Sequence, residues 1–585
     1  MKKYLFIALA ALGFAACAEK IDDTNAPVQN GELEESYIAI NLMSADVDTR
    51  APLNEYGGFE EGTAAERAIE TAYFFFFDDK GDAFNVNATP KNPATSPGDV
   101  NGVNHLSLNI SDATTPGMPN VSDITEAVLV LNTYKGIYPS QIVAVLNWTP
   151  EANEAYDLDE LHEMLATIGN DNNGYVMSNS VYMDGAKKIV DAVPVTTENI
   201  KTSAADALDK PIDIYVERVA AKVVLTASGK VTNDNIFKTD KNPELVGSEN
   251  GTLVGASNAI DVYVKLHGWE LYNDYSTSTL LKNINTSWDV TTLGLTWNDI
   301  PYFRCYWAQS QATSQSDAFA WSYSDDDKAA KGFQTNYGFN VGASANYTDR
   351  TTYTYCGENT NQKDGTTDPR TKVILKGQLM QKNGDKYEPL ELARWYGTEY
   401  AGEDALKIAV ANSLKHTVFS SADQTQYDPI TPGDLECVAG ENVGAKDYEV
   451  GFQLSTDGAA KTWYKYSSEK GYESFGDIAN NVNRDKTNAH LKTVEPALLY
   501  AEGNTYYIVD IEHLGTAGAK FGVVRNHVYQ IDIKSIKGYG SPIYNGLSFI
   551  VDQPEYPIED EGSYVAAKIN VLSWKVVKQQ VNVGE

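Results

Sequence analysis

Residues 523–536 read Val-Val-Arg-Asn-His-Val-Tyr-Gln-Ile-Asp-Ile-Lys-Ser-Ile. From Tyr529 to Lys534 each apolar residue is followed by a polar one, and two of the apolar residues are isoleucine. A period of two with β-branched residues is typical of a strand that buries one face. The stretch therefore predicts a long β-strand near the C-terminus.

Similar runs of β-branched and aromatic residues recur along the chain, separated by clusters of Gly, Asn, Asp and Pro. They lie at 71–77, 127–131, 141–148, 212–226, 259–266, 372–379, 505–511 and 565–577. This spacing indicates β-sandwiches. Two helices are predicted as well. One spans 151–168, and the other spans 391–414 with a break near Gly397 and Gly402.

Composition limits the possible classes of protein. The chain has 585 residues, of which 42% are hydrophobic and 22% charged, as in globular proteins of two to four domains. Lys and Arg number 46 against 80 Asp and Glu, a net charge of −34. Such a chain repels phosphate backbones, so nucleic acid is not expected as a partner. Its 4 cysteines are too few for a disulfide scaffold.

The N-terminus has the pattern of an export signal. Lys2 and Lys3 precede a short apolar run at 4–12, and Gly13-Phe14-Ala15-Ala16-Cys17 follows. Small residues before a cysteine resemble a bacterial lipobox, which implies a signal peptide at 1–16 and lipid, with palmitate, on Cys17. The alternative is an ordinary secretory signal cut nearby. No other stretch reaches the roughly 18 apolar residues of a membrane span. We expect the remainder to be exported, with the precursor lipid as its only membrane contact.

Residues 17–50 are expected to form a tether and propeptide. Within them Ile38, Ile40 and Leu42 alternate with other residues as one face of a half-buried strand. Arg50 follows in a polar stretch, where a trypsin-like protease could reach it. A plain loop between strands is the other interpretation.

Beyond the propeptide, two domains are expected. A boundary near Pro211 predicts domains at 51–211 and 212–585. The polar stretches 272–371 and 420–488 are interpreted as surface insertions rather than separate cores.

Catalytic motifs are absent. The sequence contains no GxSxG, P-loop, HExxH or CxxC, so we expect no enzyme and no cofactor. His162, His513 and His527 are interpreted as surface or hydrogen-bonded histidines. The acidic runs 171–174 and 325–327 lack EF-hand spacing, so no metal is expected. Cys305, Cys356 and Cys437 allow at most one disulfide, and nothing in the sequence decides which pair forms.

Two other functions compete on the same residues. Several aromatic side chains could line a sugar groove, which would suit a carbohydrate-binding surface lipoprotein; they are Trp148, Trp269, Trp288, Trp307, Trp321 and Tyr306. The many carboxylates also leave room for a glycoside hydrolase pair, the least favoured hypothesis.

Four segments resemble the fimbrillins of Bacteroidota, the pilins of type V pili. They are 141–147, 216–223, 523–536 and 569–576. The last two are similar to the shaft subunit of the minor, or short, fimbriae. The resemblance implies an all-β fold with minor helices: two tandem transthyretin-like Greek-key β-sandwich domains with long loop insertions.

The resemblance also implies a route of assembly. In that family a lipoprotein precursor reaches the outer membrane, and an arginine-specific protease cuts after the tether. Here the matching positions are Cys17 and the Arg50–Ala51 bond. The discarded strand would carry Ile38, Ile40 and Leu42, and its groove would accept a strand from another subunit.

The donor implied for that groove lies near the C-terminus, where alternate residues are apolar; they are Val565, Ala567, Ile569 and Val571. Burying about five such side chains could contribute roughly 8–15 kcal/mol before ordering costs. The alternative is that this tail is the last strand of its own domain.

The function expected from the resemblance is that of a structural pilin, the shaft subunit of a surface fimbria that supports adhesion and biofilm formation. Its expected partners are further copies of itself in a head-to-tail polymer, fimbrial tip and anchor subunits, an arginine-specific protease, and surface ligands on host or bacterial cells. The expected location is the fimbrium at the cell outer membrane.

Overall fold

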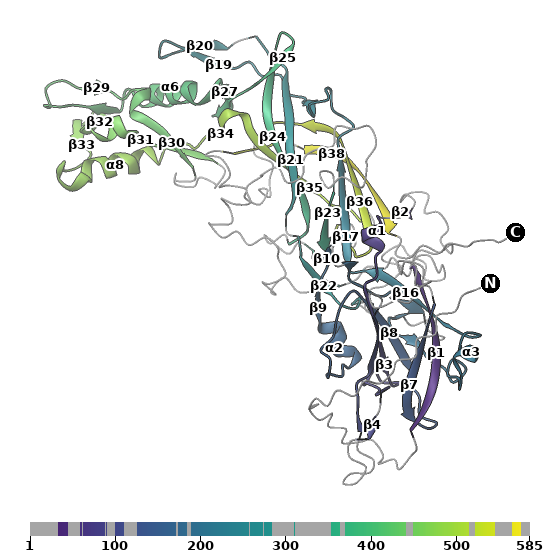
Figure 1. Cartoon of the computed structure of the whole chain (residues 1–585). Helices are drawn as coiled ribbons and strands as arrows, with labels where there is room; N and C mark the ends of the chain where they lie inside the picture. Colours follow the sequence, from purple (N-terminus) through teal and green to yellow (C-terminus); the bar gives the residue numbers. More distant parts are fainter. Residues whose placement is uncertain are drawn as a thin grey trace.

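The computed structural model shows an elongated molecule made of two β domains and a distal lobe (Figure 1). It describes residues 33–44, 59–60, 63–87, 89–90, 100–109, 126–170, 174–183, 189–256, 258–272, 274–283, 309–310, 353–362, 369–439, 449–513, 521–543 and 564–574. Strands dominate and helices are few and short, so the predicted all-β class with minor helices is confirmed.

The first domain is one sheet of eight strands in the order β6-β3-β8-β12-β16-β1-β7, with β15 beside β8. The sheet curls so that its outer strands enclose one core, and Asn132 on β7 donates a backbone hydrogen bond to Val86 beyond β3. The strands are β1 (Leu33–Ser44), β3 (Thr71–Phe77), β6 (His105–Asn109), β7 (Glu126–Tyr134), β8 (Gln141–Leu146), β12 (Met177–Asn179), β15 (Val193–Pro194) and β16 (Ile212–Arg218).

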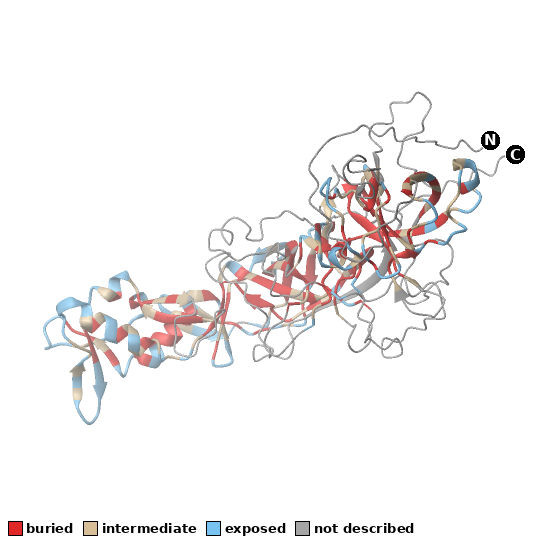
Figure 2. Cartoon of the chain, turned by 90° about the horizontal axis from the view of Figure 1, so that it is seen from below, coloured by how far each residue is buried: buried red, intermediate tan, exposed pale blue. Residues whose placement is uncertain are grey.

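Short elements decorate this sheet. They are α1 (Ala64–Arg67), α2 (Leu158–Glu163), α3 (Ala204–Ala207) and the strand pairs β4 (Thr89–Pro90) with β5 (Val100–Asn101), β10 (Gly169–Asn170) with β11 (Gly174–Tyr175), and β13 (Tyr182–Met183) with β14 (Ile189–Val190). The four consecutive phenylalanines of β3 alternate between two clusters, with Phe74 and Phe76 in one and Phe75 and Phe77 in the other. The middle of the sheet is therefore buried on both faces (Figure 2).

The second domain is a sandwich of two sheets. One has the order β2-β38-β36-β17-β23 and the other β18-β21-β24-β35-β37, with β25 beside β24. Val223 and Ile531 from the first sheet share a core with Leu375 and Val509 from the second. The strands are β2 (Phe59–Glu60), β17 (Ala220–Thr226), β18 (Ile236–Lys238), β21 (Val262–Tyr272), β23 (Tyr353–Gly357), β24 (Lys372–Asn383), β25 (Lys386–Pro389), β35 (Asn504–Asp510), β36 (His527–Lys537), β37 (Ser541–Pro542) and β38 (Tyr564–Trp574).

The distal lobe has a hydrophobic core of its own, which differs from the prediction that 420–488 is a surface insertion without one. Trp463, Phe452 and Leu406 are among its fully buried side chains. The lobe is built from two excursions of the second domain, one between β18 and β21 and one between β24 and β35. The sequence did not indicate this core, because a small lobe needs only a few apolar side chains and here they are separated by long polar stretches.

The described part of the lobe contains three sheets and most of the helical residues of the molecule. Its strands are β19 (Val246–Glu249), β20 (Thr252–Ala256), β26 (Leu392–Trp395), β27 (Thr398–Tyr400), β28 (Val418–Ser420), β29 (Asp428–Pro429), β30 (Leu435–Ala439), β31 (Val450–Leu454), β32 (Trp463–Ser467), β33 (Gly471–Ser474) and β34 (Leu498–Tyr500). Its helices are α6 (Gly402–Leu414), α7 (Thr456–Ala459) and α8 (Val482–Leu491), with 3-10 turns η3 (Pro432–Asp434), η4 (Ala479–Asn481) and η5 (Ala501–Gly503).

Both predicted helices were too long. The one expected at 151–168 is only α2, because the next residues form β9 (Leu165–Thr167), which pairs with β22 (Thr277–Thr279). The one expected at 391–414 begins at Gly402. Before it, Tyr396 and Gly397 both have positive φ and form the two-residue turn of the β26–β27 hairpin. Tertiary pairing overrode the helical spacing at both places.

One continuous stretch of chain joins the two domains. β16 pairs with β1 and β12 in the first domain, and β17 pairs with β36 and β23 in the second. Only Val219 separates them, and it is fully buried. The change of sheet thus falls at Val219 rather than near Pro211.

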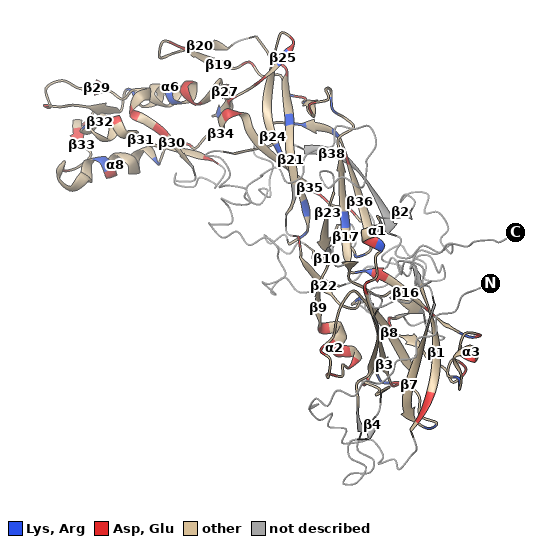
Figure 3. Ribbon diagram, viewed as in Figure 1, with Lys and Arg blue, Asp and Glu red and all other residues tan. Residues whose placement is uncertain are grey.

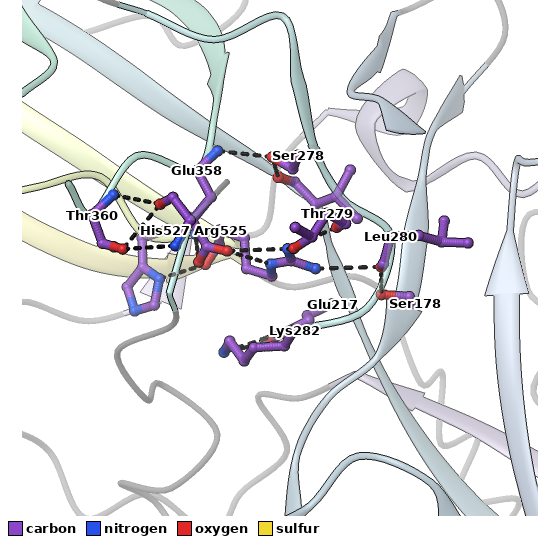
Figure 4. A network of polar contacts seen from close by, with 12 residues as sticks. Ser178, Glu217, Ser278, Thr279, Leu280, Lys282, Glu358, Thr360, Arg525 and His527 are labelled. Carbon is purple, nitrogen blue, oxygen red and sulfur yellow. Dashed lines mark hydrogen bonds and ion pairs between the residues drawn. The ribbon is translucent and has the colours of Figure 1, made fainter. Parts of the chain in front are cut away.

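Buried ion pairs surround this joint (Figure 4). Lys282 Nζ lies 3.0 Å from Glu217, and Arg525 Nη2 lies 3.0 Å from Glu358, with all four side chains at most 1% exposed. Arg525 also donates to the carbonyl and hydroxyl oxygens of Thr279. Because each buried charge has a partner, the domains are held by a desolvated polar network.

A third buried pair ties the start of the first domain to the second. Lys222 Nζ on β17 lies 2.7 Å from Glu66 on α1, and the Tyr355 hydroxyl donates to the same oxygen. Arg218 Nε donates to the main-chain oxygen of Glu66 at 2.7 Å. Burial alone would raise the pKa of Glu66, but the Lys222 ammonium and these hydrogen bonds hold that pKa below its usual value.

Replacing Lys222 by Met should destabilise the protein by about 3–5 kcal/mol, because the Glu66 carboxylate would stay buried without its cation. The pair stabilises the fold above the unfolded-state pKa of Glu66, and this contribution is lost as the pH falls through the lowered folded pKa. The loss caused by Lys222→Met should therefore shrink in acid. Calorimetric unfolding at pH 7 and in acid measures both effects.

Lys210→Met is the matched control, because Lys210 pairs with Glu198 at the surface. It should leave the unfolding temperature unchanged. Equal effects of the two substitutions would contradict the importance of the buried pair.

Candidate strand-acceptor groove

β1 is an interior strand of the first domain although it lies N-terminal to the rest of that domain. It pairs antiparallel with β7 from Leu33 to Asn41 and parallel with β16 from Ile40 to Ser44. A strand in this position has both edges hydrogen-bonded. Among the described strands β7 pairs with β1 alone, so β1 connects it to the remainder of the sheet.

The core face of β1 is fully packed. Ile38, Ile40 and Leu42 are at most 2% exposed and belong to the core shared by β3, β7, β8 and β16. The predicted alternation of these three residues is confirmed. Their burial stabilises the sheet by roughly 5–9 kcal/mol relative to exposure.

The other face of β1 is covered too, which the alternation did not indicate. Ala39 is fully buried against Val128 and Ala207 of α3. The edge of β1 opposite β7 is paired here as well, because Tyr37 exchanges two backbone hydrogen bonds with Lys201, at 2.8 and 3.0 Å. A strand in this place therefore needs a small residue under α3, and the alanine between two isoleucines was the only sign of it in the sequence.

Loss of β1 would leave a slot with a definite shape. Its two walls would be the free edges of β7 and β16, its floor would be the apolar core, and α3 would form its roof. Unpaired strand edges beside an apolar floor are the features that bind an added strand. The geometry suits a strand acceptor.

The C-terminal strand β38 lies in the second domain. It pairs antiparallel with β36 over most of its length, and its far end pairs in parallel with β2. The four residues of the predicted donor stripe lie opposite core residues of β36, in the register Val565–Ile536, Ala567–Ile533, Ile569–Ile531 and Val571–Tyr529. In the isolated chain this segment is thus a strand of its own domain.

Other predicted site residues lie outside the described part of the chain. They are Cys17, Arg50, Ala51, Cys305, Trp288, Tyr306, Trp307, Trp321 and the acidic runs 171–173 and 325–327. Of the cysteines, Cys356 and Cys437 form no disulfide and are buried in different cores.

The proposed sugar groove is not assembled by the tryptophans that are described. Trp148 packs with Phe75 and Tyr156 in the first domain, while Trp269 is buried in the core of the second. The sequence could not separate them, because an aromatic residue in a strand serves a core and a binding surface equally well.

The three histidines have partners, as interpreted from the sequence. His162 lies 2.5 Å from Asp191, His513 contacts the Tyr529 hydroxyl at 2.8 Å, and His527 contacts the carbonyl oxygen of Arg525 at 2.7 Å. Within the described ranges no group of three or more metal-ligating side chains occurs. In the same ranges no helix has the length and apolarity of a membrane span.

Comparison with known proteins finds a family match in the C-terminal region. Residues 498–580, which run from β34 through β38, match the family model described as major fimbrial subunit protein type IV, fimbrillin, C-terminal. This part of the chain is similar to the C-terminal region of fimbrillins. The resemblance to fimbrillins is confirmed there, and the closer likeness to the minor-fimbria shaft subunit stays a prediction. No curated protein matches the chain.

Solved structures with similar chains include a fimbrilin (fimA) from Porphyromonas gingivalis, with 12% identity, coverage of 93% of this chain and 98% of the other, and a TM-score of 0.36. A putative cell adhesion protein from Parabacteroides distasonis has 12% identity, coverage of 93% and 100%, and a TM-score of 0.35. The tip fimbrial protein Mfa3 from Porphyromonas gingivalis has 10% identity, coverage of 92% and 100%, and a TM-score of 0.29.

An Ile40→Asp substitution should lower the melting temperature of the uncut chain sharply, because it places an unpaired carboxylate in the apolar floor under β1. Glu35→Gln, on the same strand but exposed, should leave melting unchanged. Thermal unfolding followed by circular dichroism checks both. Similar melting of the two variants would show that β1 is not packed into the first domain.

Proposed function

We propose that this chain is the shaft subunit of a surface fimbria, a structural pilin rather than an enzyme. In this proposal it is exported as a lipoprotein through Cys17, cut after Arg50, and polymerised by donor-strand exchange in support of adhesion and biofilm formation. Tip and anchor subunits and an arginine-specific protease are its further partners. The observation that carries the proposal is the place of β1, an interior strand separated from the remaining domain by the segment that contains Arg50.

The geometry around Arg67 supports Arg50 as the point of cleavage. Arg67 is the next arginine, and it lies in α1, whose first turn has a capping box between Thr63 and Glu66. Arg67 Nε also donates to the Thr63 carbonyl oxygen. A protease needs an extended, accessible segment, and this capped turn is not one.

An Arg50→Ala precursor should stay monomeric when treated with an arginine-specific protease, whereas wild-type protein should form fibres under the same treatment. Without the cut β1 keeps the groove filled. Electron microscopy of the treated samples and N-terminal sequencing of the fibres measure the outcome, and fibre subunits should begin at Ala51.

Arg67→Ala is the control for the protease itself and should polymerise like the wild type. Fibres that begin at Ala68, or fibres formed by Arg50→Ala, would contradict cleavage at Arg50.

The donor in this proposal is the tail that contains β38. Ile569 is in register with Ile531 of the buried core, whereas Asn570 is in register with the half-exposed Gln530. The apolar stripe of β38 pairs within the second domain in the monomer, and in the fibre it would instead fill the groove of a neighbouring subunit. Each subunit would then have one groove and one plug, a head-to-tail contact that does not close.

Ile569→Asp should abolish fibres after cleavage and should shorten wild-type fibres when mixed with them, because a carboxylate in the apolar stripe prevents donation of the strand. Ile569 is also in register with Ile531 of its own domain, so the melting temperature of the uncut variant shows whether the second domain is still folded. Asn570→Asp adds the same charge one residue further along, in register with Gln530, and should polymerise normally. Fibre lengths measured by electron microscopy decide the matter. Normal fibres from Ile569→Asp would rule out donation by this segment.

A further inference from the structure

The lobe exposes a cluster of aromatic rings on the sheet with the order β29-β28-β32-β33. Phe419 lies opposite Tyr464, and Tyr466 lies opposite Tyr472, so these four side chains share one face. Tyr427, which immediately precedes β29, joins them by stacking on Tyr472. The five residues are called the aromatic face below.

The opposite side of the same sheet contributes to the core of the lobe. Val418 and Trp463 are fully buried there. The aromatic face is therefore the second side of a sheet whose first side is already packed against the core.

The rings of the aromatic face form one continuous surface. The ring centroids of Tyr427 and Tyr472 are 3.7 Å apart with an interplanar angle of 2°. The ring centroid of Tyr472 also lies 5.1 Å from that of Phe419, which is edge-on to it, and 4.9 Å from that of Tyr466. Despite these contacts Tyr466 and Tyr472 are each 40% exposed. Large exposed aromatic groups in contact with each other mark an interaction surface.

The polar ends of this surface are available to a ligand. Among the described residues, the hydroxyl groups of Tyr427, Tyr466 and Tyr472 have no hydrogen-bond partner. Tyr464, only 5% exposed, supports these rings from beneath. Tyrosine combines an apolar ring with a hydrogen-bonding group, which suits a ligand with the same combination.

Exposed polar residues beside the rings point to the charge of that ligand. Asp423, Gln424, Gln426 and Asp428 are exposed around Tyr427. Lys465 alternates with Tyr464 and Tyr466 along β32, so it lies on the other face, where its partner across the hairpin is Glu473. The carboxylates next to the rings disfavour an anionic ligand, as does the net charge of −34.

We propose that the aromatic face binds an uncharged polysaccharide. The C–H faces of pyranose rings would stack on the exposed tyrosines, and sugar hydroxyls would bond to the phenol groups and to the carboxylate and amide side chains beside them. The sheet that carries the aromatic face lies at the end of the molecule opposite β1 (Figure 1).

The test uses the full-length chain and four probes. Yeast mannan and barley β-glucan are neutral polysaccharides, dextran sulfate is an anionic one, and decaproline is a peptide that also stacks on aromatic grooves. Affinity electrophoresis and calorimetry measure binding. We expect a neutral polysaccharide to bind. Tyr466→Ala and Tyr472→Ala should each weaken binding at least tenfold.

Tyr396→Ala is the matched control, because Tyr396 is a 72% exposed tyrosine of the same lobe that contacts Trp395 instead of the aromatic face. It should bind like the wild type, and the melting temperature of each variant shows whether the lobe is folded. If Tyr472→Ala unfolds the lobe, the result for Tyr466→Ala decides. Binding of decaproline or dextran sulfate alone, no binding at all, or equal loss in Tyr396→Ala would overturn the proposal.

Discussion

An interior β-strand must be paired on both edges, and this requirement governs the first domain. β1 fills the position between β7 and β16, and among the described strands it is the only partner of β7. Its backbone completes two ladders, its isoleucines complete the core, and Ala39 completes the packing under α3. Two ladders and the packing on both faces depend on β1, so the presence of this strand decides whether the domain is closed or open.

The buried charges at the joint make it possible to open the first domain without separating it from the second. Glu66 follows the predicted cleavage site in sequence, yet it is fixed to Lys222 and Arg218. The buried ion pairs Glu217–Lys282 and Glu358–Arg525 stabilise the same joint. A cut upstream of Glu66 would therefore free β1 and leave both domains attached. Charges of both signs are spread along the described parts of the molecule, so the ion pairs at the joint differ from the rest in their burial rather than in their kind (Figure 3).

A feature of the fold could be predicted from the sequence where neighbouring residues determine it, and not where residues far apart in the sequence do. The strands β1 and β36 were found because period-two alternation is encoded in neighbouring residues. The helix expected at 151–168 failed because Leu165 to Thr167 pair with β22, more than a hundred residues away. The core of the lobe was missed because its apolar residues are gathered from 246–256 and 392–501, with polar runs between them. Ala39 was missed for the same reason, since the helix that covers it lies far along the chain.

The structure also bears on which way a strand exchange would run. In its own domain β38 pairs with ten positions of β36 and two of β2. A strand that took the place and register of β1 would pair with nine positions of β7 and five of β16. The two sets of backbone pairs are nearly equal in number, so hydrogen bonding alone does not favour either position of the strand.

An uncut chain has its groove filled by β1, which is part of the same molecule and needs no association step. A donor from another subunit pays the translational and rotational cost of association. In the proposed assembly, proteolysis would remove the intramolecular competitor irreversibly, and the direction of assembly would then come from that cut rather than from a difference between the two sheets.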